Sequence, residues 1–210
     1  MRVHQVHGRD FSGHVVRLEP LCLDHAPGLA AAAAEDRTTY GFTTVPEGVD
    51  GAAGYVRTLL ASAAVGELVP FAQVRVTDDA VVGATSYRSM RHRDGRSAPY
   101  SVEIGGTWLA ASAQRTALNT EAKLLLMTHA FETWQVGRVD LRTDARNERS
   151  CTATAALGAQ CEGVLRHWQP SHVAREAELL RDTAIFSVTA PEWPAVRARL
   201  NDRLGVDPGR

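Results

Sequence analysis

Alternating apolar and polar residues predict strands along most of the chain. The first strand is expected within residues 13–21, and strands over 70–77 and 80–90 are expected to form a hairpin that turns at Asp78 and Asp79. Further strands are expected over 100–110, 138–143, 160–168 and 182–190. The pattern therefore predicts a sheet of about seven strands.

Apolar residues at helical spacing predict helices between these strands. Asp24 is placed to cap a helix through the alanine run 30–34, and Asp50 to cap a second helix that ends near Gly66. Later helices are expected over 119–135, 147–159 and 191–204. The order β-α-α-β-β-β-α-β-α-β-β-α describes a mixed α/β fold with crossover helices only in its second half. This order excludes a TIM barrel and a regular doubly wound fold.

The composition is that of an ordinary globular chain. Its 210 residues are expected to form a single domain, 1–210. The 23 Lys and Arg residues nearly balance the 24 Asp and Glu residues, so we expect no general attraction to nucleic acid or to an acidic membrane. No apolar run is long enough to span a membrane, and the first residues lack the apolar core of a secretory signal. These features favour a cytoplasmic protein.

Neither the cysteines nor the histidines favour a metal centre. Cys22, Cys151 and Cys161 are odd in number and lack paired spacing, which argues against a disulfide framework and a zinc knuckle. His4 and His7 have metal-like spacing but no third ligand beside them. We therefore expect no bound metal.

The stretch 102–132 carries the most candidate chemistry, because a strand there leads into a helix start. Backbone N–H groups at a helix start favour a bound anion. The adjacent Gly105 and Gly106 indicate a bulge or a ligand that approaches the backbone closely. Strict alternation would place Glu103, Gly105 and Thr107 on one face, and Val102, Ile104 and Trp108 on the other. An edge strand with a solvated face is the alternative.

Several motifs follow one another in the order of a known family. They are Glu103-Ile104, Trp108-Leu109, the run QRTALNTEAK over 114–123, Arg138-Val139 with Leu141, Thr143-Asp144, Asn147 with Ser150, Leu157-Gly158-Ala159 and Glu162-Gly163. With them the chain resembles the GNAT (GCN5-related) N-acetyltransferases, and in detail their RimJ/RimL-type branch. The resemblance implies a mixed, mostly antiparallel sheet with flanking helices, and acetyl-CoA as co-substrate.

The resemblance also implies where the co-substrate binds. The family's pyrophosphate motif falls on Gln114, Ala117 and Asn119, and neither of its glycine positions is glycine here. A Cβ on Ala117 would crowd a backbone at positive φ but not one that is already helical. The expected cofactor-binding residues are Thr107, Trp108, Leu109, Gln114, Arg115, Thr116, Ala117, Leu118, Asn119, Thr120, Asn147 and Ser150.

Acetyl transfer to an amine needs a base for the amine, a donor for the oxyanion and an acid for the departing thiolate. Glu103 resembles the family's base position, and a backbone N–H near Trp108 or Leu109 is the expected oxyanion donor. Ser150 resembles the acid position of the RimL-like branch, with first-turn capping as its alternative role. The tyrosine that many relatives carry one turn later is replaced by Thr154.

The acceptor is expected to be a primary amine, either a protein N-terminal α-amine or an amino-bearing small molecule such as an antibiotic. Its pocket is expected to include Tyr40 and Phe42 from the irregular segment 35–50, together with Tyr87, Glu103, His167 and His172. The alternative function is a GNAT-fold module that binds CoA or a partner without turnover. A homodimer is one expected assembly, with no nucleic acid or membrane partner.

The arginines near one hairpin and the histidine of one helix each have a functional and a purely structural interpretation. Arg88, Arg91, Arg93 and Arg96 cluster around a hairpin and could touch phosphates of the co-substrate, although such loops are commonly just solvated. His129 falls on the apolar stripe of the 119–135 helix, which favours a packed core residue.

Overall fold

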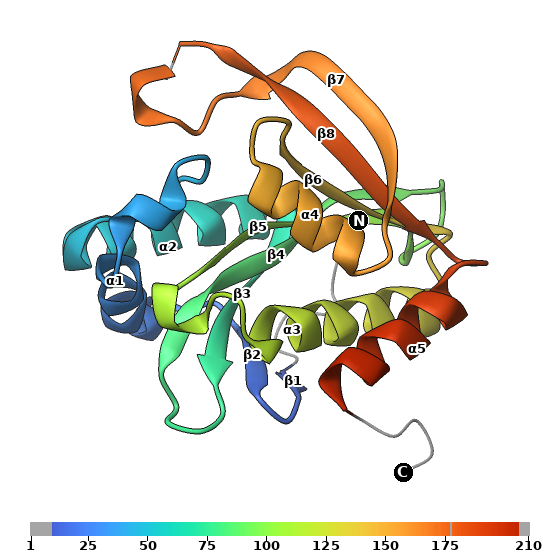
Figure 1. The fold of residues 1–210 in the computed structure, drawn as a ribbon, viewed down its shortest axis with the longest axis horizontal. Helices are drawn as coiled ribbons and strands as arrows, with labels where there is room; N and C mark the ends of the chain where they lie inside the picture. Colours follow the sequence, from blue (N-terminus) through green and yellow to red (C-terminus); the bar gives the residue numbers. More distant parts are fainter. Residues whose placement is uncertain (1–9, 177, 206–210) are drawn as a thin grey trace.

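A single eight-stranded sheet organises the chain in a computed structural model that describes residues 10–176 and 178–205 (Figure 1). The strand order is β1-β2-β3-β4-β5-β6-β8-β7, and every neighbouring pair is antiparallel except β5 and β6. The strands are β1 Phe11–Ser12, β2 Val16–Pro20, β3 Leu68–Arg75, β4 Val81–His92, β5 Pro99–Leu109, β6 Arg138–Asp144, β7 Gln160–Pro170 and β8 Leu180–Thr189. The predicted mixed, mostly antiparallel sheet is confirmed, with the two-residue β1 as an additional strand.

Five α-helices flank this sheet in the predicted order. They are α1 Ala26–Ala34, α2 Gly48–Ala64, α3 Ala117–Thr128, α4 Glu148–Ala156 and α5 Trp193–Leu204. The two predicted aspartate caps are wrong. A short 3-10 helix containing Asp24 precedes α1, whose N-cap is His25. Asp50 lies inside the first turn of α2, where its negative charge interacts favourably with the helix dipole. It does not cap the helix.

The helices cover both faces of the sheet (Figure 1). On one face, the indole of Trp108 donates from Nε1 to the hydroxyl of Tyr55 in α2 at 3.2 Å. On the other face, the hydroxyl of Tyr87 donates to the carbonyl oxygen of Leu126 in α3 at 2.6 Å. The side chain of His129 is buried here against Phe11 and the Trp134 ring, which confirms it as a packed core residue.

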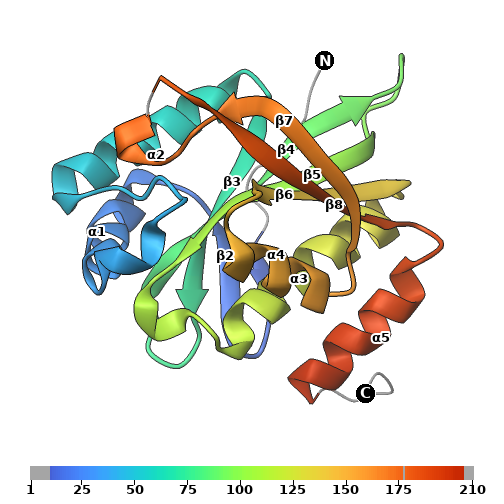
Figure 2. The same cartoon turned by 45° about the horizontal axis from the view of Figure 1, so that its top comes forward.

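The parallel pair β5 and β6 is joined over a short stretch only. The register runs from Ser101 opposite Arg138 to Glu103 opposite Asp140 and then ends, although both strands continue. Beyond that point the two strands diverge, and their facing backbone groups are not paired with each other. The first turns of α3 and α4 lie beside this divergence (Figure 2). The middle of the sheet is therefore open where two helices begin.

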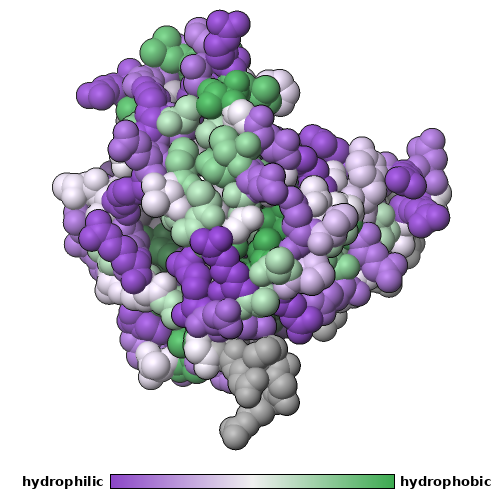
Figure 3. All heavy atoms as spheres, turned by 45° about the vertical axis from the view of Figure 1, so that its right-hand side comes forward, coloured by the Kyte–Doolittle hydropathy of each residue, from purple (hydrophilic) through white to green (hydrophobic). Residues whose placement is uncertain are grey.

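The β7–β8 hairpin extends past the rest of the sheet toward the side of α2, as both ribbon views show (Figures 1 and 2). The strand β7 is exposed along nearly its whole length. Its side chains Val164, Leu165 and Trp168 are exposed apolar groups. Apolar residues form a band on the face seen in Figure 3, between hydrophilic residues on either side.

Within the described part of the chain, no helix combines the length and the apolar character needed to cross a membrane. The same residues contain no group of three or more His, Cys, Asp or Glu side chains arranged to hold a metal ion. Cys22, Cys151 and Cys161 are free thiols. His4 and His7 lie outside the described residues.

Candidate active site

A cavity of about 1580 Å³ lies where β5 and β6 diverge. This volume exceeds the roughly 300–1,000 Å³ typical of a site for one small molecule, so two substrates can meet there. It is lined from three directions: by the first turns of α3 and α4, by the segment 38–44 and by the β7–β8 hairpin. The expected site residues that line it are Tyr40, Phe42, Glu103, Thr107, Trp108, Leu109, Gln114, Arg115, Thr116, Asn119, Thr120, Asn147, Ser150 and His172.

The glycine pair forms the predicted bulge in β5. Ser86 pairs with Gly105 and Ala84 with Trp108, so two residues of β5 oppose the single Thr85 of β4. Gly106 has a φ of 62°, in the left-handed region that favours glycine. A Cβ at Gly105 would lie 2.7 Å from Oε1 of Glu103. The first glycine therefore makes room for the carboxylate, and the second allows the backbone to bulge.

The bulge also changes which face each following side chain occupies. The hydroxyl of Thr107 hydrogen-bonds that of Thr85 at 2.8 Å, on the α3 side of the sheet. The Trp108 indole packs edge-on against the rings of Tyr40 and Tyr55, on the α2 side. The strict alternation expected from the sequence is therefore wrong beyond Gly106, because the extra residue reverses the direction of the side chains that follow.

Tyr87 is not an acceptor-pocket residue. Its side chain has 0% exposure, and its ring packs against Phe71 and Trp134 on the α3 side of the sheet. Its neighbours Ser86 and Arg88 line the cavity instead. The prediction chose the right strand but the wrong face, because successive residues of a strand point in opposite directions.

Three other expected residues lie off the cavity wall. His167 has a φ of 48° and its backbone N–H donates to Oδ1 of Asp182 at 2.9 Å, while its side chain is not part of the lining. Leu118 is buried in the core, and Ala117 is exposed without lining the cavity. Of the two histidines expected near the acceptor, His172 alone reaches the site.

The start of α3 presents backbone donors to one end of the cavity. The hydroxyl of Thr116 caps the helix by accepting from the N–H of Leu118 at 3.3 Å. The left-handed residue is Arg115, with a φ of 61°, and Ala117 is the first residue of the helix. Two residues after Ala117, Oδ1 of Asn119 is buried without a hydrogen-bond partner among the described residues. This end of the cavity therefore has unused polar capacity for a ligand.

Because Ala117 is already helical, its methyl group does not occupy a position that requires glycine. We expect Ala117→Gly to leave CoA affinity within about threefold or to weaken it, since glycine costs roughly 1 kcal/mol at a helical position. Calorimetric titration of the wild type and the variant with CoA measures this change. Binding that tightens tenfold or more would show that the methyl group crowds the ligand.

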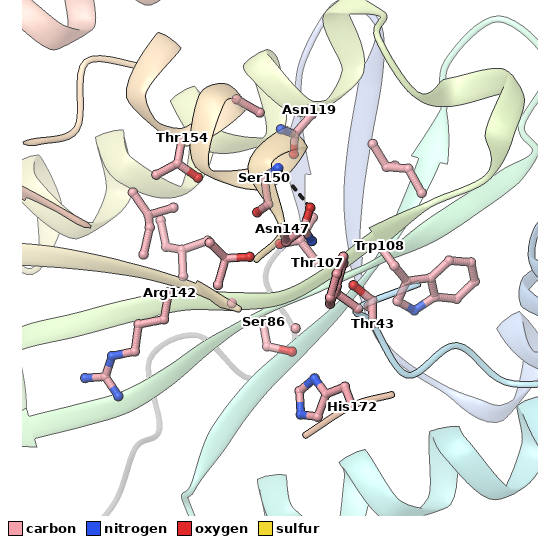
Figure 4. Close-up of a pocket in the computed structure, with 18 of the residues that line it drawn as sticks. Thr43, Ser86, Thr107, Trp108, Asn119, Arg142, Asn147, Ser150, Thr154 and His172 are labelled. Atoms are coloured by element: carbon pink, nitrogen blue, oxygen red, sulfur yellow. Dashed lines mark hydrogen bonds between the residues drawn. The ribbon is translucent and has the colours of Figure 1, made fainter. Parts of the chain in front are cut away.

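The start of α4 faces the same end of the cavity (Figure 4). Oδ1 of Asn147 accepts from the backbone N–H of Ser150 at 3.1 Å and so caps the helix. Ser150 does not cap the helix, which leaves its hydroxyl available at the cavity wall. Thr154, where many relatives have tyrosine, also lines the cavity. Two helix starts thus converge on one end of the site, which suits an anionic ligand.

Glu103 lines the cavity at the last paired position of β5, and only one oxygen of its carboxylate is held by the protein. Oε2 is 3.2 Å from Nη1 of Arg142 and accepts from the hydroxyl of Ser89 at 3.0 Å. Oε1 has no hydrogen-bond partner within the described chain and points toward Gly105. Arg142 also contacts Asp140 at 3.5 Å, so the guanidinium is fixed by two carboxylates. The sequence could have indicated a role for Arg142, because a charged residue is unusual in a short and mostly buried strand.

Lys123 is a further cavity residue that the sequence analysis did not identify. It has 4% exposure, and its Nζ donates to Oγ1 of Thr107 at 2.7 Å. No carboxylate pairs with it within the described residues, and burial lowers its pKa to about 7. Its position one turn after Asn119 in α3, on the side that faces the strand, was the available signal.

Aromatic and polar contacts fix the loop that closes the cavity beside α3. The hydroxyl of Tyr40 donates to the carbonyl oxygen of Leu109 at 3.1 Å. Nε2 of Gln114 donates to the same oxygen at 2.9 Å and to Thr39 at 3.1 Å, while Oε1 accepts from Arg149 at 2.7 Å. The family's first pyrophosphate position is therefore a structural bridge between the segment 38–44, the end of β5 and the start of α4.

Known proteins share both the sequence pattern and this fold. Residues 16–160 match the family model described as an acetyltransferase (GNAT) domain. A proposed acetyltransferase from T. thermophilus is 34% identical, with a TM-score of 0.77 and coverage of 93% of this chain and 97% of that one. A GCN5-related N-acetyltransferase from Brucella melitensis is 28% identical, with a TM-score of 0.78 and coverage of 96% and 86%.

A more distant structure shows the same fold with a ligand. Mycobacterium smegmatis RimJ, solved in complex with CoA-disulfide, is 23% identical over 94% of this chain and 92% of that one, with a TM-score of 0.73. A search of curated proteins found no match. The family model spans well over half of the chain, and the T. thermophilus relative is above 30% identity over nearly its whole length. The chain therefore belongs to the GNAT acetyltransferase family and is an acyl-CoA-dependent N-acetyltransferase.

Proposed function

We propose that the protein transfers an acetyl group from acetyl-CoA to a primary amine that enters the cavity from the side of the β7–β8 hairpin. The observation that carries this proposal is the arrangement around Glu103. Two helix starts lie toward one end of the cavity, and the hairpin residue His172 lies toward the other (Figure 4). Glu103 stands at the last paired position of β5 before the strands diverge, and its Oε1 is unpaired among the described residues. An anionic co-substrate and an amine can thus meet at one base.

The residues at the helix starts fit the co-substrate. The N–H groups at the start of α3, with the guanidinium groups of Arg115 and Arg149 on the adjoining surface, suit a pyrophosphate. The unpartnered Oδ1 of Asn119 offers an acceptor, and the bulge at Thr107 interrupts the strand where a pantetheine arm would lie. When bound, acetyl-CoA supplies the activated thioester. The chain's own groups orient it and handle the protons.

Each group in the site is assigned a role by the proton or hydrogen bond that it can accept or donate. Oε1 of Glu103 accepts the proton of the amine, directly or through a water molecule, while Arg142 holds the other oxygen in place. Backbone N–H groups near Trp108 and Leu109 stabilise the oxyanion. Ser150 gives a proton to the thiolate, for which its hydroxyl is free because Asn147 caps the helix. An unperturbed thiol has a pKa of about 8.5, so protonation of the leaving group helps less than removal of the amine proton.

The finer family assignment also belongs to the proposal. The motifs over 100–163 and the shared fold of RimJ support a RimJ/RimL-type enzyme. The acceptor is then a protein N-terminal α-amine or an amino-bearing small molecule. The homodimer, the cytoplasmic location and the single domain stay predictions.

The test is release of free thiol from acetyl-CoA in the presence of a panel of amines and short peptides. Thiol release that depends on an amine, with the acetylated amine found by mass spectrometry, supports the proposal. If the protein binds acetyl-CoA and no amine in the panel is acetylated, the non-catalytic binding module is favoured instead.

Ser150→Ala tests the acid. We expect kcat to fall by about tenfold, with CoA affinity nearly unchanged, since a thiolate leaves tolerably without help. The loss should shrink at high pH, because above a thiol pKa of about 8.5 the leaving thiolate needs no proton. A matched control is Thr152→Ala on the same helix. Equal rates for the Ser150→Ala variant and the wild type across the pH range would rule out the assigned role.

A further inference from the structure

Two guanidinium groups that line the cavity, those of Arg88 in β4 and Arg181 in β8, have no carboxylate partner among the described residues. Arg142 pairs with Glu103 and Asp140, and Arg146 pairs with Asp144 and Glu176. By contrast, neither Arg88 nor Arg181 makes an ion pair within the described part of the chain, although both line the cavity. The mechanism above uses neither of them.

Arg181 is the more unusual of the two because it is buried. It has 9% exposure, and its Nη2 donates to Oε1 of Gln169 at 3.1 Å. Its Nε is buried without a partner among the described residues. Burial lowers the pKa of Arg181, and the charges of Asp144 and Glu103 only partly oppose that effect. A buried cation without a paired anion is costly to fold, which is the expected signature of a binding group kept free for a ligand.

Arg88 reaches the same region from β4. It lies across from Glu103 in the strand register, but the carboxylate of Glu103 is bound by Arg142. The guanidinium of Arg88 has room because residue 106 is glycine. A Cβ on Gly106 would lie 2.9 Å from Nη1 of Arg88. The chain thus places a glycine at positive φ beside a guanidinium that has no ion-pair partner in the described structure.

His172 lines the same cavity as the two arginines. Its pKa is lowered by partial desolvation and then by the positive charges of Arg181 and Arg88, while Asp144 acts in the opposite direction. Both guanidinium groups therefore act on the same imidazole at the cavity wall. A neutral imidazole has one hydrogen-bond donor and one acceptor, and it adds no carboxylate that would pair with the two guanidinium groups. Ser86, two residues before Arg88 in β4, also lines this cavity.

We propose that Arg88 and Arg181 bind an oxyanion group carried by the amine acceptor, so that the preferred acceptors are amines bearing a carboxylate or a phosphate. This inference rests on the proposed function for the presence of the amine. Guanidinium groups suit both oxyanions, because their planar donors form paired, charge-assisted hydrogen bonds. The anion would lie at the hairpin end, with the amine directed toward Oε1 of Glu103.

The experiment compares matched acceptors. Linear ω-amino carboxylates and ω-aminoalkyl phosphates are tested beside n-alkylamines of equal length, with acetyl-CoA saturating. For the wild type, kcat/KM is expected to be about 10- to 100-fold higher for at least one anionic series, mainly through KM. The series that is preferred identifies the oxyanion. Equal kcat/KM values for the anionic and uncharged acceptors would overturn the proposal.

The variants Arg88→Met and Arg181→Met should each reduce this preference by about tenfold. Arg181→Lys should restore part of it, and Arg57→Met, an exposed change on α2, should not alter it. Circular dichroism and thermal unfolding verify that each variant is folded. A preference that is unchanged in both methionine variants would also overturn the proposal.

A binding measurement separates this proposal from the proposed function. Calorimetry with the N-acetylated ω-amino carboxylate and phosphate, in the presence of CoA, needs no turnover. Binding that is lost in Arg181→Met supports the anion site even if no amine is acetylated. If alkylamines are acetylated and neither anionic product binds more tightly than the uncharged N-acetylalkylamine, acetyl transfer stands and the anion site is rejected.

Discussion

Glu103→Gln is expected to lower kcat/KM for the best acceptor by about 10²–10⁴-fold at neutral pH. The variant keeps the size of the side chain and one oxygen atom for Arg142, but it removes the carboxylate that takes the proton. Arg142 also retains Asp140, so the fold should be preserved. Steady-state thiol release with varied acceptor measures the loss.

The pH dependence of the activity lost in Glu103→Gln tests whether Glu103 acts as a base. As the pH approaches the pKa of the acceptor amine, neutral amine becomes abundant and the loss should shrink. Acetyl-CoA affinity should stay within about threefold, because Glu103 is not at the helix starts. Glu67→Gln, at an exposed part of the cavity rim, is the matched control and should retain activity. An unchanged kcat/KM in Glu103→Gln would remove Glu103 from the mechanism.

Much of the fold could be predicted because the periodic signals were strong. All seven expected strands and all five expected helices are present, and the glycine pair correctly indicated the bulge. The two-residue β1 is too short to produce a periodic pattern. The two predicted caps were wrong because aspartate also suits other positions near a helix start: Asp24 lies in the 3-10 helix before α1, and Asp50 lies in the first turn of α2.

The site was less predictable because side-chain direction depends on single-residue register. A bulge after Gly105 reverses Thr107 and Trp108, and a shift of one position separates the buried Tyr87 from the cavity residue Arg88. Residues brought in by other elements, such as Arg142 and Arg181, depend on which strands become neighbours. That order, β6-β8-β7, is not visible in local sequence patterns.

Removing the buried charge of Lys123 is expected to stabilise the protein in a pH-dependent manner. The pKa of Lys123 is about 7 in the fold, against 10.5 for an unperturbed lysine. Below pH 7 both the folded and the unfolded chain carry the proton, and the folded state bears the full cost of burying it. Between pH 7 and about 10.5 the unfolded state binds more protons, so stability rises with pH by up to about 1.4 kcal/mol for each pH unit.

Lys123→Met should therefore raise the free energy of unfolding at pH 6–7, by up to about 5 kcal/mol, and the gain should fade as the pH approaches 10. Thr107 keeps its hydrogen bond to Thr85, so no buried hydroxyl loses its last partner. Urea unfolding of both proteins from pH 6 to 10 measures the difference, and Arg57→Met should show no comparable pH trend. Because Lys123 is the only lysine in the chain, its Nζ resonance in ¹⁵N-lysine-labelled protein reports the titration directly. A midpoint above pH 10, with no pH-dependent gain in the variant, would show that the ammonium group is not desolvated in the fold.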